Sequence, residues 1–245
     1  MVDMKVGIGE QKMEFPCPVC GQPMRKLPKS KKLICYFCGQ TGESDSACKT
    51  EHFVCEACRL ANAQEMIEKV GLTATETDPI KIADKLMIHP AFPVYGIEHH
   101  CIAAVAMYKA IKNAKGEKVD KKDIKKLTTL TQKLPYGSCG FLGVCGAAAG
   151  VGTAFSALLG ASYTSDRERS IAMEATSRAN LAIAKEGGPR CCVASVYTAL
   201  EEGSKVVKEI FHIDLKPHLP LKRCKFVTKA EDCRRLRCRF SEEQA

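Results

Sequence analysis

The residues best suited to chemistry begin with eight metal-ligand side chains in the first 58 positions. Two Cys-x2-Cys-Gly knuckles, Cys17/Cys20 and Cys35/Cys38, are separated by fourteen residues, a spacing at which tight turns can place four thiolates around one tetrahedral ion. These four predict a zinc-ribbon site. A second quartet within eleven residues predicts a second four-coordinate site: Cys48, His52, Cys55 and Cys58. The alternative, a set of buried inert cysteines, does not favour such knuckles.

A further metal site is expected near the end of the chain. Cys224, Cys233 and Cys238 supply three thiolates in a basic segment that lacks helical or strand periodicity. Three thiolates need a fourth partner: His212 or His218 would complete a zinc site, whereas an open iron would suit an iron–sulfur cluster. Because the ferredoxin-like Cys-x2-Cys-x2-Cys run is absent, zinc is favoured over iron here.

A third group of reactive side chains coincides with expected helix starts. The helix dipole and the free N–H groups of a first turn favour thiolate over thiol and neutral over charged imidazole. Arg190 should favour the thiolate of Cys191 further, and Gly143 and Gly146 would let backbone approach a bound cluster or anion. Each of these residues taken alone is better interpreted as a core residue. Their common position at helix starts, however, favours one shared functional site. The candidate catalytic residues are His99, His100, Cys139, Cys145, Cys191 and Cys192, with Gly143, Gly146 and Arg190 as cofactor-binding residues.

The elements that must position these groups are mainly helical. Residues 1–60 lack apolar periodicity and should form a small zinc-ribbon-like domain held by metal. Residues 61–213 should form an all-helical domain that carries the Cys/His site, and 214–245 a basic Cys-rich tail, otherwise unstructured. Helices are expected over about 60–70 (ended by Gly71), 79–89 (capped by Asp78), 97–116, 121–134 (capped by Asp120), 165–185 and 189–203.

An uncharged stretch over residues 134–165 needs a separate decision. Hydropathy across 141–161 resembles that of a transmembrane span, but five glycines interrupt the segment. We therefore expect a tightly packed central helix in which Gly146-x3-Gly150 allows close backbone approach, rather than a membrane segment.

Composition bears on compartment and partners. Residues 1–14 show no signal-peptide pattern, so a cytoplasmic location with reduced thiols is expected, and metal or redox chemistry becomes the default for the fifteen cysteines. The net charge of +9 is concentrated at residues 25–32, 115–126 and 222–239. Basic clusters are compatible with nucleic-acid binding, but without stacking aromatic residues they favour a solvated surface.

Several enzyme classes are excluded by missing motifs. The sequence has no Walker-type phosphate loop, no Gly-x-Gly-x2-Gly after a strand, no Cys-x2-Cys-His for haem attachment and no His-Glu-x2-His for a zinc peptidase.

The combination of motifs resembles a known family. The segments that carry the likeness are Gly96-x-Glu98-His99-His100, Gly140-Phe141-x-Gly143-x-Cys145-Gly146 and Gly188-Pro189-Arg190-Cys191-Cys192, together with the N-terminal knuckles and the cysteine-bearing tail. They are similar to an uncharacterised cysteine-rich domain family found mostly in methanogenic archaea and anaerobic bacteria, and the likeness spans Cys17 to about Cys238. The family has no established reaction, so the resemblance implies that these segments form a site without naming its chemistry.

Two functions remain open. In the first, zinc folds the front of an anaerobic metal- and thiol-dependent protein, which performs redox, sulfur-handling or metallocofactor-maturation chemistry and has a small molecule or a protein as its partner; an iron–sulfur cluster is a further candidate cofactor. In the second, the chain is a non-enzymatic zinc-ribbon module that binds nucleic acid or protein. Whether it is an enzyme, and its oligomeric state, are left open.

Overall fold

The computed structural model describes residues 12–219 and 224–241. The chain divides into two compact units, Met1–Leu60 and Ala61–Ala245. Residues 1–11 lie outside the described residues, and the prediction about a signal peptide partly depends on them. Two of the basic residues near the end of the chain, Lys222 and Arg223, also lie outside.

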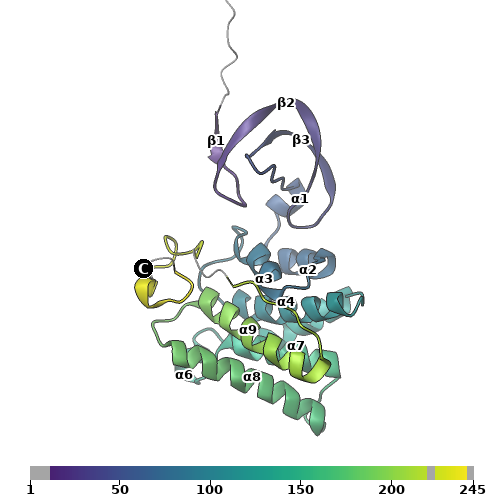
Figure 1. The fold of residues 1–245 in the computed structure, drawn as a ribbon, viewed down its shortest axis with the longest axis vertical. Coiled ribbons are helices and arrows are strands. Elements are labelled where there is room, and N and C mark those ends of the chain that lie inside the picture. The colour runs from purple at the N-terminus through teal and green to yellow at the C-terminus, as the bar shows by residue number, and fades with distance from the viewer. Residues whose placement is uncertain (1–11, 220–223, 242–245) are drawn as a thin grey trace, which may run out of the picture. The chain divides into compact units, whose positions relative to one another are not determined.

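The N-terminal unit is a small antiparallel sheet with cysteine-bearing turns. Strands β1 (Lys12–Pro16), β2 (Pro23–Ile34) and β3 (Thr41–Ala47) pair in the order β1-β2-β3, and a single helical turn, α1 (Glu56–Arg59), follows them (Figure 1). Its buried side chains are mainly cysteines with Phe37 and Ala47. So small a core cannot stabilise sixty residues by itself, which agrees with a fold held by metal.

The second unit is helical, as expected, and the described part of the chain is mainly α. Its elements run from the blue α2 to the yellow-green α9 in Figure 1, where the long green α8 lies along the lower edge of the unit. They are α2 (Ala63–Thr73), α3 (Pro79–Met87), α4 (Glu98–Ala114), α5 (Lys121–Thr131), α6 (Ser138–Phe141), α7 (Gly146–Leu159), α8 (Arg167–Glu186), α9 (Cys192–Phe211) and a 3-10 turn, η1 (Arg235–Arg237).

Local capping chemistry explains where several helices begin. The side chain of Asp78 accepts from the backbone N–H of Ile80 at 2.9 Å, and Pro79 occupies the first helical position of α3. Asp120 forms a capping box with Asp123 at the start of α5. Both predicted caps are therefore confirmed, because such signals act within one turn.

Two predicted helix ends are wrong for a tertiary reason. Helix α2 continues past Gly71 to Thr73, and α9 continues past Gly203 to Phe211. A Cβ on Gly71 would lie 2.6 Å from Ile124 Cδ1, and one on Gly203 would lie 2.6 Å from Met107 Cε. These glycines permit close helix packing rather than termination.

The glycine-rich stretch is divided between α6 and α7, and α7 packs against α4. A Cβ on Gly150 would lie only 2.4 Å from the backbone oxygen of His100, so the predicted close approach is confirmed. Helix α4 is buried continuously from His99 to Ile111. Within the described ranges, none of the helices combines the length and apolarity that crossing a membrane requires.

The tail is not unstructured, contrary to expectation. Phe226, Cys238 and Phe240 are buried, and the ring of Phe240 packs against Tyr197 of α9 with a centroid distance of 5.3 Å. Arg234 donates to the backbone oxygens of Glu186 and Gly187, both at 2.9 Å. Long-range aromatic and ionic contacts, which no local pattern reveals, fold residues 224–241 back onto α8 and α9.

Candidate functional site

The N-terminal unit contains two groups of possible metal ligands, but their membership is interleaved. One group is Cys17, Cys20, Cys48 and His52, and the other is Cys35, Cys38, Cys55 and Cys58. Within each group the ligand atoms lie within 4.8 Å of one another. All eight expected ligands are therefore brought together, whereas the expected division into Cys17/Cys20/Cys35/Cys38 and Cys48/His52/Cys55/Cys58 is wrong.

Strand β2 explains this pairing. It lies between the two knuckles, and a strand of 12 residues spans roughly 40 Å when extended. Strand β3 runs back along β2, with Ala47 opposite Arg25, which returns Cys48 to the first knuckle. A bridge between Cys35 and Phe53 then brings Cys55 to the second knuckle. The sheet thus brings to each knuckle a pair of ligands from the segment that follows β3: Cys48 and His52 to the first, and Cys55 and Cys58 to the second.

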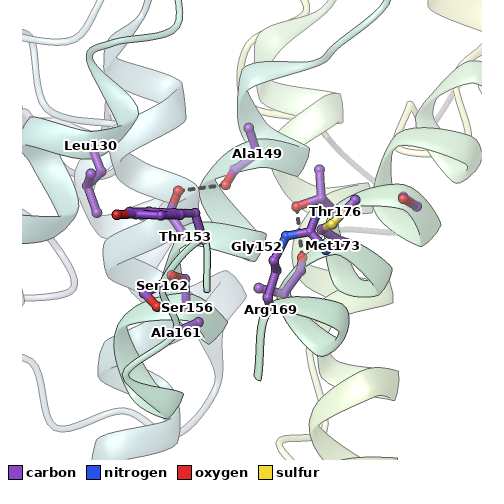
Figure 2. A pocket seen from close by; sticks show the side chains of 13 residues that line it. Leu130, Ala149, Gly152, Thr153, Ser156, Ala161, Ser162, Arg169, Met173 and Thr176 are labelled. Carbon is purple, nitrogen blue, oxygen red and sulfur yellow. Dashed lines mark hydrogen bonds between the residues drawn. The ribbon is translucent and has the colours of Figure 1, made fainter. Parts of the chain in front are cut away.

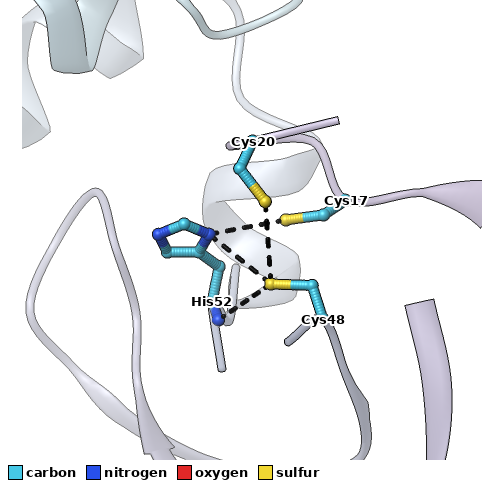
Figure 3. Close-up of side chains that lie close together, drawn as sticks. All are labelled: Cys17, Cys20, Cys48 and His52. Atoms are coloured by element: carbon cyan, nitrogen blue, oxygen red, sulfur yellow. Dashed lines mark hydrogen bonds between the residues drawn. The ribbon is translucent and has the colours of Figure 1, made fainter. Parts of the chain in front are cut away.

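The first group has the dimensions of a tetrahedral site. Cys20 Sγ lies 3.8 Å from Cys48 Sγ, and His52 Nδ1 lies 3.5 Å from Cys48 Sγ and 3.8 Å from Cys17 Sγ (Figure 3). Bond lengths of about 2.3 Å for Zn–S and 2.0 Å for Zn–N place tetrahedral ligands roughly 3.5–3.8 Å apart. The four donor atoms therefore fit one ion without rearrangement.

Hydrogen bonds prepare one thiolate in this group. Burial opposes ionisation of Cys48, but hydrogen bonds from the Thr50 side chain and the backbone N–H of His52 outweigh burial and lower its pKa to about 6. Burial raises the pKa of Cys17 to about 11. A metal ion would therefore find one thiolate already formed and would displace the proton of its neighbour.

The second group follows the same design. Cys38 Sγ lies 3.7 Å from Cys55 Sγ, and the backbone N–H of Cys55 points at Cys35 Sγ over 3.4 Å. Burial opposes ionisation of Cys35, but the backbone N–H groups of Cys38 and Cys55 lower its pKa to about 7. Burial raises the pKa of Cys58. Each group offers four ligand atoms to a metal ion, which is the pattern typical of structural sites.

In the helical unit, the third predicted group converges on one cavity, which we call the thiol cavity. Its volume open to a water centre is about 50 Å³. Of the nine predicted catalytic and cofactor-binding residues, Gly143 is absent from its lining within the described chain. The lining includes His99, His100, Cys139, Cys145, Gly146, Arg190, Cys191 and Cys192, with Gly96 and Tyr136.

Two histidines from the first turn of α4 line this cavity, and each has a ring nitrogen without a hydrogen-bond partner. His99 is 1% exposed and His100 is 9% exposed, and among the described residues neither Nδ1 has a hydrogen-bond partner. Burial lowers the pKa of His99 to about 4 and also lowers the pKa of His100. Both imidazoles are therefore neutral near pH 7, as predicted, but burial rather than the helix dipole is the main cause. A buried ring nitrogen without a partner, on a residue that lines a cavity, is suited to a ligand.

The thiols come from three helix starts. Cys145 is the N-cap residue of α7, Cys192 begins α9, and Cys139 lies in the short α6, where it is exposed. Burial raises the pKa of Cys192 to about 11 and outweighs the backbone N–H of Gly96. Burial likewise raises the pKa of Cys191. The expected thiolates at the start of α9 are thus wrong for the free protein, because desolvation exceeds the effect of the helix terminus.

Arg190 has a different role from the expected one. Its guanidinium stacks over Tyr95 at 4.7 Å, donates to the hydroxyl of Tyr136 and lies 3.5 Å from a carboxylate oxygen of Asp232. The cation that lowers the pKa of Cys191, against the larger effect of burial, is Arg234 of the tail. Arg190 therefore joins the wall of the cavity to the tail.

One residue outside the motifs, Asn180, helps to set the shape of the cavity wall. Asn180 of α8 accepts from the backbone N–H of Cys145 at 2.8 Å and donates to the backbone oxygen of Gly143 at 3.0 Å. Gly143, with φ of +68°, forms the turn before α7. A Cβ on Gly146 would lie 2.0 Å from the ring of His100. The glycines thus make room for a turn and for a histidine, and Asn180, which no sequence motif marks, holds the turn in place.

A second, smaller cavity lies beside the start of α9, and we call it the tail cavity. It is lined by Cys191 with the three predicted tail ligands, Cys224, Cys233 and Cys238. Cys191 lines the thiol cavity as well. Neither expected histidine reaches it: His212 ends α9, and the backbone N–H of His218 donates to Asp78. The fourth cysteine of this group was not predicted, because it is distant in sequence.

A wider, open groove lies between α7 and α8, with a volume of about 530 Å³ (Figure 2). Two of its hydroxyl groups are used within their own helices, because Thr153 donates to Ala149 and Thr176 donates to Ala172. No cysteine or histidine lines it in the described part of the chain. Its size therefore gives no reason to prefer it to the two cysteine-lined cavities.

Comparison with known proteins identifies a family whose function is unknown. Neither a curated protein nor a solved structure matches the chain. Residues 67–241, which contain both cavities, match a family of unknown function, DUF5714. The chain therefore belongs to the DUF5714 family.

Proposed function

We propose that the chain is a cytoplasmic metal- and thiol-dependent protein in which zinc folds the N-terminal unit and the thiol cavity carries redox or sulfur-handling chemistry. The observation that carries the proposal is the convergence of Cys139, Cys145 and Cys192 on two buried imidazoles with unpartnered Nδ1 atoms. Sites that hold reactive or ligating groups combine perturbed titratable side chains with a cavity in this way.

The thiol cavity differs from a structural metal site. In the described chain its cysteines and histidines are absent from the groups whose donor atoms lie within 4.8 Å of one another. A space of about 50 Å³ is far below the 300 Å³ or more of a drug-sized pocket. The cavity therefore suits a small inorganic ligand held between the thiols, such as a sulfur species or a metal ion passed on during cofactor maturation.

The cysteines of the thiol cavity can support sulfur transfer by thiol–polysulfide exchange. Exposed Cys139 attacks a terminal sulfur of polysulfide, a new S–S bond forms on the protein, and the old S–S bond breaks. The shortened polysulfide leaves with the electron pair. The thiol proton of the exposed Cys139 passes to solvent. Cys145 and Cys192 can then accept the bound sulfur by the same exchange.

The test is to add inorganic polysulfide to the full chain, purified without oxygen, and to map added sulfur atoms by peptide mass spectrometry. We expect persulfide on the cavity cysteines and loss of it from Cys145 and Cys192 in a Cys139→Ala variant. Cys101, which is buried in α4 with its Sγ 3.1 Å from Thr131 Oγ1, is the internal control and should stay unmodified. Sulfur confined to N-terminal thiols, or unaffected by Cys139→Ala, would contradict the proposal.

One observation keeps a second function in view. Lys26, Lys29 and Lys32 of β2 are exposed in the N-terminal unit. As a nucleic-acid or protein-binding module, the chain should bind an anionic oligonucleotide with an affinity that falls steeply with salt, since neutralising phosphates releases counterions. However, Lys31 pairs with Glu51 at 2.6 Å and Lys32 lies opposite Glu43, so acidic neighbours offset this charge.

A further inference from the structure

The tail cavity brings together four cysteines from two distant parts of the chain. Cys191 is the N-cap residue of α9, whereas Cys224, Cys233 and Cys238 come from the folded-back tail. Its other walls are largely apolar and include Val193, Tyr197 and Phe226. The centre of a water molecule can occupy only about 10 Å³ of the cavity, roughly the space of one water. An organic substrate does not fit in this space. A group that bonds directly to the lining sulfurs needs less free space, because metal–sulfur bonds of about 2.3 Å are shorter than non-bonded contacts.

The spacing of the sulfurs argues against a single ion. In the N-terminal unit, all ligand atoms of each group lie within 4.8 Å of one another, as one tetrahedral ion requires. The four tail-cavity cysteines are all described, and no three of their sulfurs meet the same criterion. They nevertheless line one common cavity together with the buried Arg234. Four thiols that surround a space without closing on one point are suited to a multi-atom metal cluster.

The cavity also contains a cation suited to an anionic occupant. The side chain of Arg234 is only 5% exposed and lines the cavity. Its Nη atoms bind Glu186 and Gly187, but its Nε has no partner among the described residues. A buried guanidinium N–H without an acceptor is costly unless an acceptor arrives. A cluster of iron and sulfide bound by four thiolates is anionic, and hydrogen bonds to its sulfurs tune its potential.

Supporting contacts fix the ligand-bearing tail in place without metal. Arg239 binds Glu186 at 2.8 Å and Glu201 at 2.7 Å, and the backbone N–H of Asp232 donates to the Tyr95 hydroxyl at 3.0 Å. The hydroxyl of Tyr197 donates to Asp84 of α3. The ligands are therefore positioned by tertiary contacts rather than by a short local motif.

We propose that Cys191, Cys224, Cys233 and Cys238 bind an iron–sulfur cluster, with the Nε–H of Arg234 directed at it. On assembly, four S–H bonds break, four Fe–S(Cys) bonds form and the protons pass to solvent; iron and sulfide are supplied from solution. The site does not depend on the sulfur chemistry proposed for the thiol cavity. Because Cys191 lines both cavities, a bound cluster would lie next to the thiol cavity.

The test uses the full chain, purified without oxygen and reconstituted with ferrous and ferric salts and sulfide. Iron, acid-labile sulfide, visible absorption and the electron paramagnetic resonance spectrum of the dithionite-reduced protein are then measured. We expect bound iron and sulfide in the wild type, and at least a tenfold loss in Cys191→Ala, Cys224→Ala, Cys233→Ala and Cys238→Ala. The matched control is Cys192→Ala, next in sequence to Cys191 but lining only the thiol cavity, which should retain the cluster.

Two results would overturn the proposal. One is a reconstituted wild type that holds zinc but no iron or sulfide. The other is iron retained in the four variants but lost in Cys192→Ala or Cys145→Ala, which would place a cluster in the thiol cavity instead. Far-ultraviolet circular dichroism separates loss of ligation from loss of folding, and the wild-type spectra test the proposal even if a variant fails to fold. Sulfur labelling of Cys139 tests the proposed function independently.

Discussion

In the N-terminal unit the donor atoms of each ligand group lie within 4.8 Å of one another, whereas in the described helical unit the cysteines and histidines surround cavities without reaching that spacing. The first arrangement has little apolar core around it, and the second is built on long, buried helices. A preassembled group gains its stability from one ion and so serves folding. Groups held apart by a folded scaffold leave space between them for a ligand. The same residue types therefore serve different ends in the two units.

The largest expected effect is loss of metal from the N-terminal unit, and double variants would test its interleaved pairing. Cys20→Ser/Cys48→Ser removes two ligands of one group and should lose about one ion per chain, whereas Cys20→Ser/Cys35→Ser damages both groups and should lose about two. Structural zinc contributes roughly 10 kcal/mol or more to small domains, so protease sensitivity of residues 12–60 should rise sharply. Zinc content per chain is the measurement. The reverse pattern of ion loss would restore the sequential pairing.

The tail should respond to loss of charge pairing rather than loss of metal. Glu186 accepts from Arg239 at 2.8 Å, Arg234 at 3.2 Å and Thr198 at 2.6 Å. Glu186→Gln leaves the buried Arg234 without its counterion, which should cost about 3 kcal/mol and expose residues 224–241 to proteolysis. Denaturant unfolding measures the cost. Glu68→Gln, which breaks an exposed pair with Lys121, should cost under about 1 kcal/mol; equal effects would mean that the tail is not held by this network.

The histidines of the thiol cavity should make the helical unit sensitive to acid. Burial lowers the pKa of His99 to about 4, so between that pH and its ordinary value near 6.5 the unfolded chain binds a proton that the folded chain does not. Stability should fall as pH drops from about 6.5 to about 4, by about 3 kcal/mol, and this contribution stops changing below that range. Unfolding free energies of His99→Gln should show a shallower pH slope. His218→Gln, at an exposed side chain, should keep the wild-type slope.

The smallest expected effect tests the packing of the cavity wall. In Gly146→Ala, a Cβ 2.0 Å from the His100 ring must displace that ring or separate α4 from α7, at a cost of about 1–3 kcal/mol. Gly140→Ala is the matched control, because a Cβ there meets nothing within 4 Å. Thermal unfolding and the rate of thiol alkylation in the cavity are the measurements. Similar behaviour of the two variants would show that the close contact is not required.

The interleaved ligands show where sequence reasoning reaches its limit. The two knuckles and the two later pairs are local turns, and their residue types alone identify them as ligands. Which knuckle joins which pair depends on the register of β2 against β3, with Lys26 opposite Ser46 and Ile34 opposite Thr41. That register is a property of the folded sheet. The spacing of the ligands along the chain is compatible with either pairing, so it does not reveal which one forms.

The helical unit shows the same limit at longer range. The helix caps at Asp78 and Asp120 follow from signals within one turn. The position of the reactive residues near helix starts follows from the same kind of local signal. The ionisation of Cys191 and Cys192 does not, because it depends on how deeply tertiary packing buries them. The role of Arg234 is equally hidden, since its partners Glu186 and Gly187 lie nearly fifty residues earlier.

By itself, the sequence determined the ligand types, most helix starts, the mainly helical class and the reactive side chains that line the thiol cavity, because capping, periodicity and Cys-x2-Cys turns are local. Only the tertiary structure decided the pairing of the N-terminal ligands, the fourth cysteine of the tail cavity and the protonation of the buried thiols. These depend on contacts between segments far apart in the chain and on burial, which arise only when the whole chain has folded.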